Sequence, residues 1–142
     1  MEYSSKAISF ALIKDIINNS NNNLEKFLLQ QNYIQFGLIT LVSLRCRFLD
    51  RDLRRWIENQ TLGSLIKIYK VCAVRNENEV LLAQLLEKYN RSRNYLVHKI
   101  VKDCNWKKAS NEVVEANKEG EEIMKRLENV LSEMIKPFLK KS

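Results

Sequence analysis

The sequence predicts an all-α protein, an antiparallel bundle of four to five helices that forms a single domain over residues 1–142. Three observations predict this fold. Only three glycines and one proline occur in 142 residues, so few positions interrupt a helix. Apolar residues recur at intervals of three and four along most of the chain, as helices require. The chain shows no internal repeat or linker, and its length suffices to bury one core.

The first third of the chain is expected to form two helices. Helical spacing covers residues 4–17, and the Asn-rich segment 18–23 predicts a turn, because Asn side chains compete for backbone hydrogen bonds. Asn22 or Asn23 would cap the helix that follows, over residues 24–56. Its apolar stripe comprises Leu24, Phe27, Leu28, Ile34, Leu38, Leu41, Val42 and Phe48, with the polar Gln31 at the same spacing.

The segment 24–56 forms either one very long helix or two helices joined near residues 51–54. Thr61 is a suitable N-cap for a short helix over Leu62–Ala73, and Asn76 and Asn78 mark another turn and cap. The buried face predicted for the short helix consists of Leu62, Leu65, Ile66 and Tyr69.

The second half of the chain predicts two long helices. The first covers residues 79–104, with an apolar face made of Leu82, Leu85, Leu86, Tyr89, Leu96, Ile100 and Cys104. A break is expected at residues 105–110, with Ser110 as the cap of the last helix. That helix would cover residues 111–135 and end before Pro137, which lacks a backbone N–H.

The composition favours a polyanionic partner, with nucleic acid first and a membrane surface second. The net charge is +7, and the positive residues gather at residues 45–55, 91–108 and 136–142. No segment resembles a signal peptide or a membrane span. The three cysteines, Cys46, Cys72 and Cys104, show no metal spacing and are expected to be buried free thiols. We therefore expect a cytoplasmic protein without membrane association.

Arg93 is the position where the helical pattern breaks. On a wheel of about 100° per residue, it falls in the middle of the apolar arc of its own helix. A guanidinium keeps its charge there and needs a partner, a bound anion or water. Residues that break a local rule are enriched at functional sites.

His98, the only histidine, lies on another side of this helix with Asn94. The two are four residues apart and can touch, and an imidazole exchanges protons near neutral pH. Arg93 and His98, in contrast, lie roughly 140° apart on a regular helix. They would converge if the Arg93 side chain curled round, if the helix carried a π-bulge, or if a symmetric dimer joined two copies. We favour the dimer.

The segment RNYLVH, from Arg93 to His98, resembles the signature of the HEPN superfamily, in which an Arg and a polar residue precede a His by a few positions. The earlier stretch TLGSLI, residues 61–66, is similar to one found in small members. The superfamily contains helical domains of prokaryotic toxins, phage-defence proteins and CRISPR-associated ribonucleases. Its usual bundle of four or five helices would cover the whole chain.

The resemblance implies metal-independent endonucleolytic cleavage of RNA, in a composite site of a homodimer and without a cofactor. The ribose 2′-OH would attack the adjacent phosphate. His98 would act as general base or acid, Arg93 would hold the phosphate, and Asn94 would orient either group. Flanking phosphates would be contacted by Arg91, Lys99 and Lys102. The sequence shows no cluster of carboxylates or cysteines that suits a metal.

In one respect the sequence departs from some toxins of the superfamily. These carry a tyrosine two residues after the histidine, which a partner enzyme modifies to silence them. Ile100 occupies that position here, and Tyr95 does not replace it. The resemblance therefore leaves room for an antitoxin protein, but not one that acts by this modification.

Two other interpretations remain open. A HEPN-like domain without catalysis would serve as an RNA-binding or protein-interaction module. A helical adaptor or immunity protein would use Arg93 in a structural ion pair, with Glu58, Glu87 or a glutamate of the last helix. Both tryptophans, Trp56 and Trp106, are expected to be core or interface anchors rather than platforms for bases.

Overall fold

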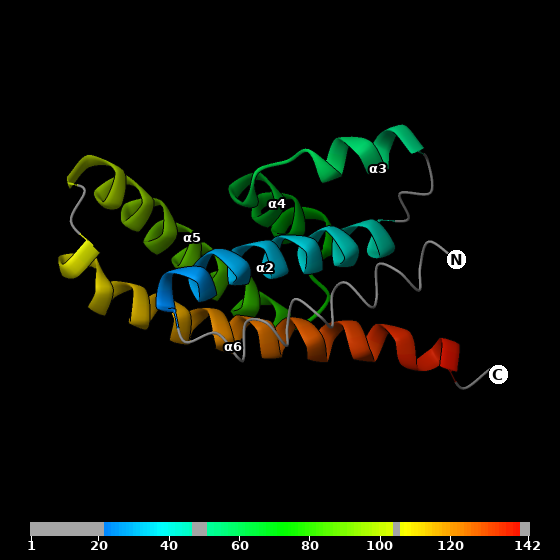
Figure 1. Cartoon of the computed structure of the whole chain (residues 1–142). Coiled ribbons are helices and arrows are strands. Elements are labelled where there is room, and N and C mark those ends of the chain that lie inside the picture. Colours follow the sequence, from blue (N-terminus) through cyan, green and yellow to red (C-terminus); the bar gives the residue numbers. More distant parts are fainter. Residues whose placement is uncertain (1–21, 47–50, 104–105, 140–142) are drawn as a thin grey trace.

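The computed structural model describes residues 22–46, 51–103 and 106–139, and that part of the chain contains helices and no strand (Figure 1). Its elements are α2 (Asn23–Arg45), α3 (Arg51–Glu58), α4 (Leu62–Ile68), the π-helix η1 (Tyr69–Ala73), α5 (Glu77–Asp103) and α6 (Trp106–Leu139). The predicted all-α bundle is confirmed. The helix predicted over residues 4–17 lies outside the described residues.

Three long helices, α2, α5 and α6, build the body of the bundle, and α3 and α4 lie to one side of α2 (Figure 1). Helix α5 runs antiparallel to both of its long neighbours. Helices α2 and α6 are therefore parallel, as two contacts along them show: Lys26 pairs with Glu121, and Tyr33 donates to Glu128. Three helices in mutual contact cannot all be antiparallel, so the predicted arrangement holds for two of the three pairs.

The start of α2 is capped as predicted. The Asn22 side chain accepts hydrogen bonds from Leu24 N at 3.0 Å and Glu25 N at 3.2 Å. Helix α2 then ends at Arg45, and a separate α3 begins at Arg51. The sequence left open one long helix or two helices over residues 24–56. Two helices is therefore correct, and the break between them lies before residues 51–54.

The starts of α4 and α5 are capped in the same way, by side-chain oxygens that accept hydrogen bonds from backbone N–H groups. Thr61 Oγ1 accepts from Ser64 N at 3.2 Å, and Asn76 Oδ1 accepts from Glu79 N at 3.0 Å. Asn78, the other predicted turn residue, lies inside α5. The predicted helix over Leu62–Ala73 is present, but its last five residues widen into the π-helix η1.

Two predicted boundaries of the last helix are wrong. Helix α6 already begins at Trp106, and Ser110, the predicted cap, lies inside it. At the other end α6 continues past Pro137 to Leu139. A proline in the last turn removes only one backbone hydrogen bond, and its fixed φ suits a helix, so Pro137 does not have to end the helix. A serine such as Ser110 is also tolerated inside a helix at a small cost in propensity.

The core lies between α2, α5 and α6 and extends under α4 and η1. Tyr33, Tyr69 and Tyr89 are the largest fully buried side chains. The predicted faces are largely confirmed by the buried residues Leu62, Leu65, Ile66, Leu82, Leu86 and Leu96, whereas Leu85 is half-buried and Ile100 lies outside the described side chains.

The prediction of buried thiols is wrong for the two cysteines that the structure describes. Cys46 is half-buried at the end of α2, and Cys72 is exposed on η1. Partial burial raises the pKa of the Cys46 thiol. The spacing of η1 explains the difference for Cys72, because the π-turn directs Tyr69 and Ala73 into the core and leaves the residues between them outside. Cys104 lies outside the described residues.

A buried ion pair connects the end of α2 to η1 and α5. Arg45 Nη1 donates to the Glu79 carboxylate and to the Ala73 carbonyl oxygen, the latter at 2.8 Å. The Tyr69 hydroxyl donates to the same carboxylate at 2.9 Å. Burial, followed by this hydrogen bond to Glu79, raises the pKa of Tyr69. The acceptors that surround Arg45 offset the cost of burying its charge.

Gly120 permits the close approach of α6 to α2. A Cβ added there would overlap Gln30 Oε1 and lie 2.8 Å from Gln30 Cδ. Gln30 itself is fully buried, and its Nε2 donates to the Asn117 carbonyl oxygen at 3.0 Å. Because this amide has a buried partner, it cannot move aside freely.

None of the described helices is long and apolar enough to cross a membrane.

Gly120→Ala should therefore lower the free energy of unfolding by about 1–3 kcal/mol, since the added methyl group overpacks the α2–α6 contact. Chemical denaturation monitored by circular dichroism measures this change. Gly37→Ala is the matched control, because it is also a buried helical glycine but its Cβ would meet only Leu127 Cδ1 at 3.5 Å. That variant should be neutral or more stable by about 0.5–1 kcal/mol. Equal effects of the two substitutions would contradict the packing argument.

Candidate functional site

The segment from Arg93 to His98 lies in the second half of α5, which is α-helical over its whole length from Glu77 to Asp103. Arg93 is half-buried, whereas Asn94 and His98 are exposed. Regular helical geometry therefore separates Arg93 from His98, as the wheel predicts.

Arg93 is directed toward α2. Its Nε donates to Gln31 Oε1, and Gln31 is only 8% exposed. Beside this contact lies the Tyr89 ring, which is fully buried and packs against Phe27 with ring centroids 6.5 Å apart. Arg93 thus joins α5 to α2 at a place where both helices face the core.

Charges from α5 and α6 meet around the Tyr89 hydroxyl. Burial raises the pKa of Tyr89 most, the Arg93 charge lowers it, and the Glu119 carboxylate of α6 raises it. Glu119 also pairs with Lys88 of α5 at 3.5 Å. A polar cluster of Gln31, Tyr89, Arg93 and Glu119 therefore occupies the junction of the three long helices.

This arrangement excludes two of the three ways to unite Arg93 with His98. The Arg93 side chain extends to Gln31 and does not curl round toward His98. The π-helical turn of the described chain is η1, at Tyr69–Ala73, whereas the stretch around Arg93 is regular α-helix. Convergence of the two groups within the described part of one copy is thus absent.

The outward face of α5 carries the other predicted residues. Arg91, Asn94 and His98 are all exposed, and they follow one another along one side of the helix. The neighbouring apolar residues Tyr95 and Val97 are 60% and 42% exposed. Lys99 and Lys102 belong to α5 as well, but their side chains lie outside the described part.

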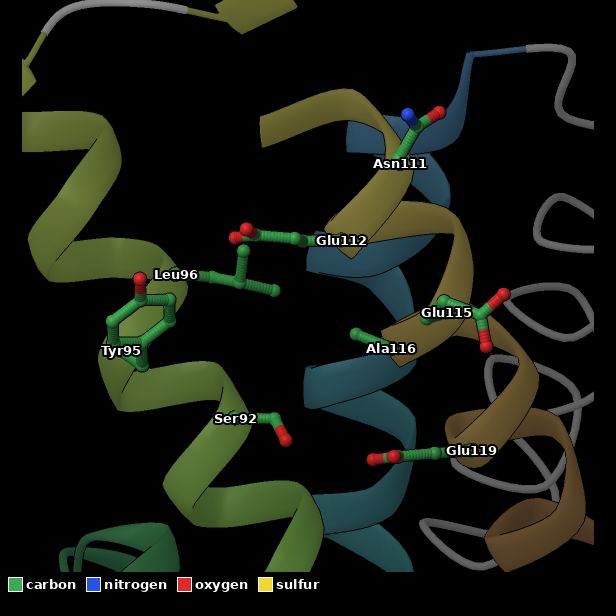
Figure 2. A pocket seen from close by; sticks show the side chains of 8 residues that line it. All are labelled: Ser92, Tyr95, Leu96, Asn111, Glu112, Glu115, Ala116 and Glu119. Carbon is green, nitrogen blue, oxygen red and sulfur yellow. The ribbon is translucent and has the colours of Figure 1, made fainter. Parts of the chain in front are cut away.

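A cleft of about 320 Å³ opens between α5 and α6 on another side of this segment (Figure 2). It is lined by Ser92, Tyr95 and Leu96 of α5 and by Asn111, Glu112, Glu115, Ala116 and Glu119 of α6. Figure 2 shows Glu112 and Glu119 reaching across toward α5, while Glu115 points away. Carboxylates in this cleft repel anionic groups.

The ion pair proposed for a structural Arg93 is not found among the described residues. Glu58 is exposed on α3, and Glu87 pairs with Lys70 at 2.9 Å. Glu119, in the last helix, shares the surroundings of Tyr89 with Arg93 without an ion pair between them. The partner is instead the neutral amide of Gln31. In the sequence, this partner is indicated only by the presence of a polar residue, Gln31, within the apolar stripe of α2.

The described residues contain no group of three or more His, Cys, Asp or Glu side chains that could hold a metal ion. Comparison with protein-family models, with curated proteins and with solved structures finds no significant match to this chain. The fold itself defines the class of protein as an all-α helical bundle.

Arg93→Ala should lower the free energy of unfolding by about 2 kcal/mol, because a hydrogen bond from a charged donor is lost and the Gln31 oxygen stays buried without it. His98→Ala and Asn94→Ala, at exposed positions, should each change it by less than about 0.5 kcal/mol. Urea denaturation of the three variants measures these effects. Gln31→Met combined with Arg93→Ala closes a double-mutant cycle. A coupling energy of zero would show that the contact does not stabilise the bundle.

Proposed function

We propose that this protein is a metal-independent endoribonuclease of the toxin or phage-defence kind, with a composite site formed by two copies of the chain. The observation that carries the proposal is the exposure of Arg91, Asn94 and His98 together on the outward face of α5. A basic group, an amide and the only imidazole of the chain are thereby available to one ligand.

The chemistry assigned to these groups is transesterification. His98 accepts the proton of a ribose 2′-OH, whose oxygen attacks the adjacent phosphorus. The bond to the 5′-oxygen breaks, and that oxygen takes up a proton, which leaves a 2′,3′-cyclic phosphate and a 5′-OH. Arg93 stabilises the charge on the phosphate, since Nε contacts Gln31 and the terminal amino groups stay available for a bidentate contact. Asn94 orients the phosphate or the imidazole.

A second copy is needed to bring Arg93 of one chain near His98 of the other. A two-fold axis pairs a surface with itself, so an axis beside the outward face of α5 would bring the two motifs together. The exposed side chain of Val97 supports this surface as the interface, because a partner that covers it removes apolar area from water. An antitoxin protein that binds the same face would block both dimer and RNA.

The approach of RNA is favoured by the distribution of charge. Arg91 is exposed on the outward face, and Lys99 and Lys102 follow it along α5. The carboxylates of Glu112 and Glu119 lie in the cleft toward α6. Phosphates are therefore attracted to one side of α5 and repelled from the other.

The second candidate function is a HEPN-like module, or a helical adaptor, without catalysis. The contact between Arg93 and Gln31 favours it, because that contact gives the arginine a structural role without any ligand. In such a protein, substitution of His98 would leave RNA binding and any effect on cell growth unchanged.

The wild-type protein should cleave total RNA in the presence of EDTA, and His98→Ala should abolish that cleavage. The physical reason is that the imidazole moves the proton while no metal takes part. Gel electrophoresis of the RNA, with end-group analysis for the cyclic phosphate, measures the reaction. Arg126→Ala, at a surface position of α6, is the control and should cleave as wild type does. Cleavage by the His98 variant, or cleavage only after metal is added, contradicts the mechanism.

Arg93→Lys and His98→Ala should each be inactive alone and should regain activity when the two are mixed. Lysine keeps a donor for Gln31 but loses the bidentate contact to phosphate. Half of the mixed dimers contain one copy of each variant and hence one intact site of two, so about a quarter of wild-type activity is expected. The rate of RNA cleavage after subunit exchange measures it. Complete inactivity of the mixture, with exchange verified, contradicts a composite site.

A further inference from the structure

The outward face of α3 combines arginines with an exposed indole. Arg51, Arg55 and Trp56 are all exposed, Trp56 to 50%, so of the two roles that the sequence predicts for this tryptophan, core or interface anchor, the core role is wrong. Ile57 is the buried residue that attaches α3 to the bundle. Arg51, Arg55 and Trp56 are therefore accessible to a ligand.

Some cations of the described chain have a carboxylate partner, and others, those of α3 and Lys125 of α6 among them, have none. Cations with carboxylate partners occur elsewhere, at Lys26, Arg45, Lys70, Lys88, Lys118, Arg126 and Lys136. In the described part, in contrast, none of the three arginines of α3 forms an ion pair. Exposed guanidinium groups that are not held in an ion pair are suited to bind phosphates from outside.

The positions of the arginines and the indole around the axis of α3 decide which of them can bind the same ligand. Arg51 and Arg55 lie about 40° apart around the axis, and Trp56 lies about 100° beyond Arg55. The exposed carboxylate of Asp52 falls between the arginines and the indole. It keeps phosphates on the arginine side, so that a base attached to the same backbone extends toward Trp56.

We propose that this face of α3 binds single-stranded RNA, with a base stacked on Trp56 and phosphates held by Arg51 and Arg55. Aromatic side chains stack on unpaired bases of any sequence, and duplex bases are not accessible in this way. The binding does not require cleavage by the α5 residues, so it stands apart from the proposed function.

The connection from α3 through α4 toward α5 gives this surface a role. The chain leaves α3 and enters α4 next to α5, where a Cβ on Gly63 would lie 3.2 Å from Asn90 Nδ2. Asn90 is one helical turn before Asn94. Figure 1 shows α3 and α4 together on that side of the bundle. A strand bound on α3 can therefore continue toward the outward face of α5.

A membrane surface is the other partner that arginines beside a tryptophan attract. Helices that lie in a lipid interface bury a continuous apolar face. In α3 only Leu53 and Trp56 are exposed apolar residues, because Ile57 faces the core. The apolar area is too small for that role, whereas a single indole suffices for one base.

The test measures binding of fluorescent oligouridylate and oligothymidylate to the full chain by anisotropy. Oligothymidylate lacks the 2′-OH and cannot be cleaved by transesterification, so it reports binding alone. Trp56→Leu should weaken binding of both probes about tenfold or more, and Trp56→Phe should keep most of the affinity. Arg51→Ser with Arg55→Ser should lower the slope of log affinity against log salt by about 1.4, the effect of two phosphate contacts.

The matched control is Lys118→Ser with Lys125→Ser, which removes the same charge from exposed positions of α6 and should leave the affinity nearly unchanged. Equal losses in the two double variants would overturn the proposal, as would wild-type affinity in Trp56→Leu. Binding to anionic lipid vesicles that depends on Trp56, without binding to oligonucleotides, would assign the face to a membrane instead. Cleavage that depends on His98 together with unchanged binding in Trp56→Leu would reject this surface and keep the nuclease.

Discussion

The contact between α2 and α6 at Gly120 is the constraint on which the arrangement of the other elements depends. The glycine lets the buried Gln30 side chain lie against α6 and donate to the Asn117 carbonyl oxygen. The next residue, Gln31, faces α5 and accepts the hydrogen bond of Arg93. Two successive side-chain amides of α2 therefore contact the two other long helices. The position of α2 between α5 and α6 determines where Arg93 lies. A shift of α2 by one residue would remove both contacts.

Much of the fold follows from local rules. The caps at Asn22, Thr61 and Asn76 and the buried faces of the helices could be predicted, because they depend on neighbours within one turn. The start of α6 at Trp106 could not, since a serine is tolerated inside a helix as well as at its cap. At the site, the exposure of His98 and the separation from Arg93 follow from helical periodicity alone. The role of Gln31 depends on how α2 meets α5, which no local pattern contains.

The described charges are divided between opposite sides of the bundle. Helix α6 carries the carboxylates of the cleft and several of the paired lysines and arginines, whose fields largely cancel. The arginines of α3 form no ion pair among the described residues, whereas Arg91 of α5 lies in the field of the Glu87 carboxylate. A positive net charge alone attracts any polyanion, but this division gives the attraction a direction. It would align a nucleic acid with α3 and the outward face of α5.

The hydrogen bond to Gln31 is compatible with both a structural and a chemical role of Arg93. A neutral amide leaves the positive charge uncompensated, whereas a carboxylate partner would neutralise it and weaken its field at a phosphate. The amide also fixes Nε, so the orientation of the planar guanidinium is set before a ligand arrives. Glu119 also lies near Tyr89 and forms no ion pair with Arg93. The amide partner therefore anchors Arg93 in the bundle and at the same time leaves its charge available to an anionic ligand.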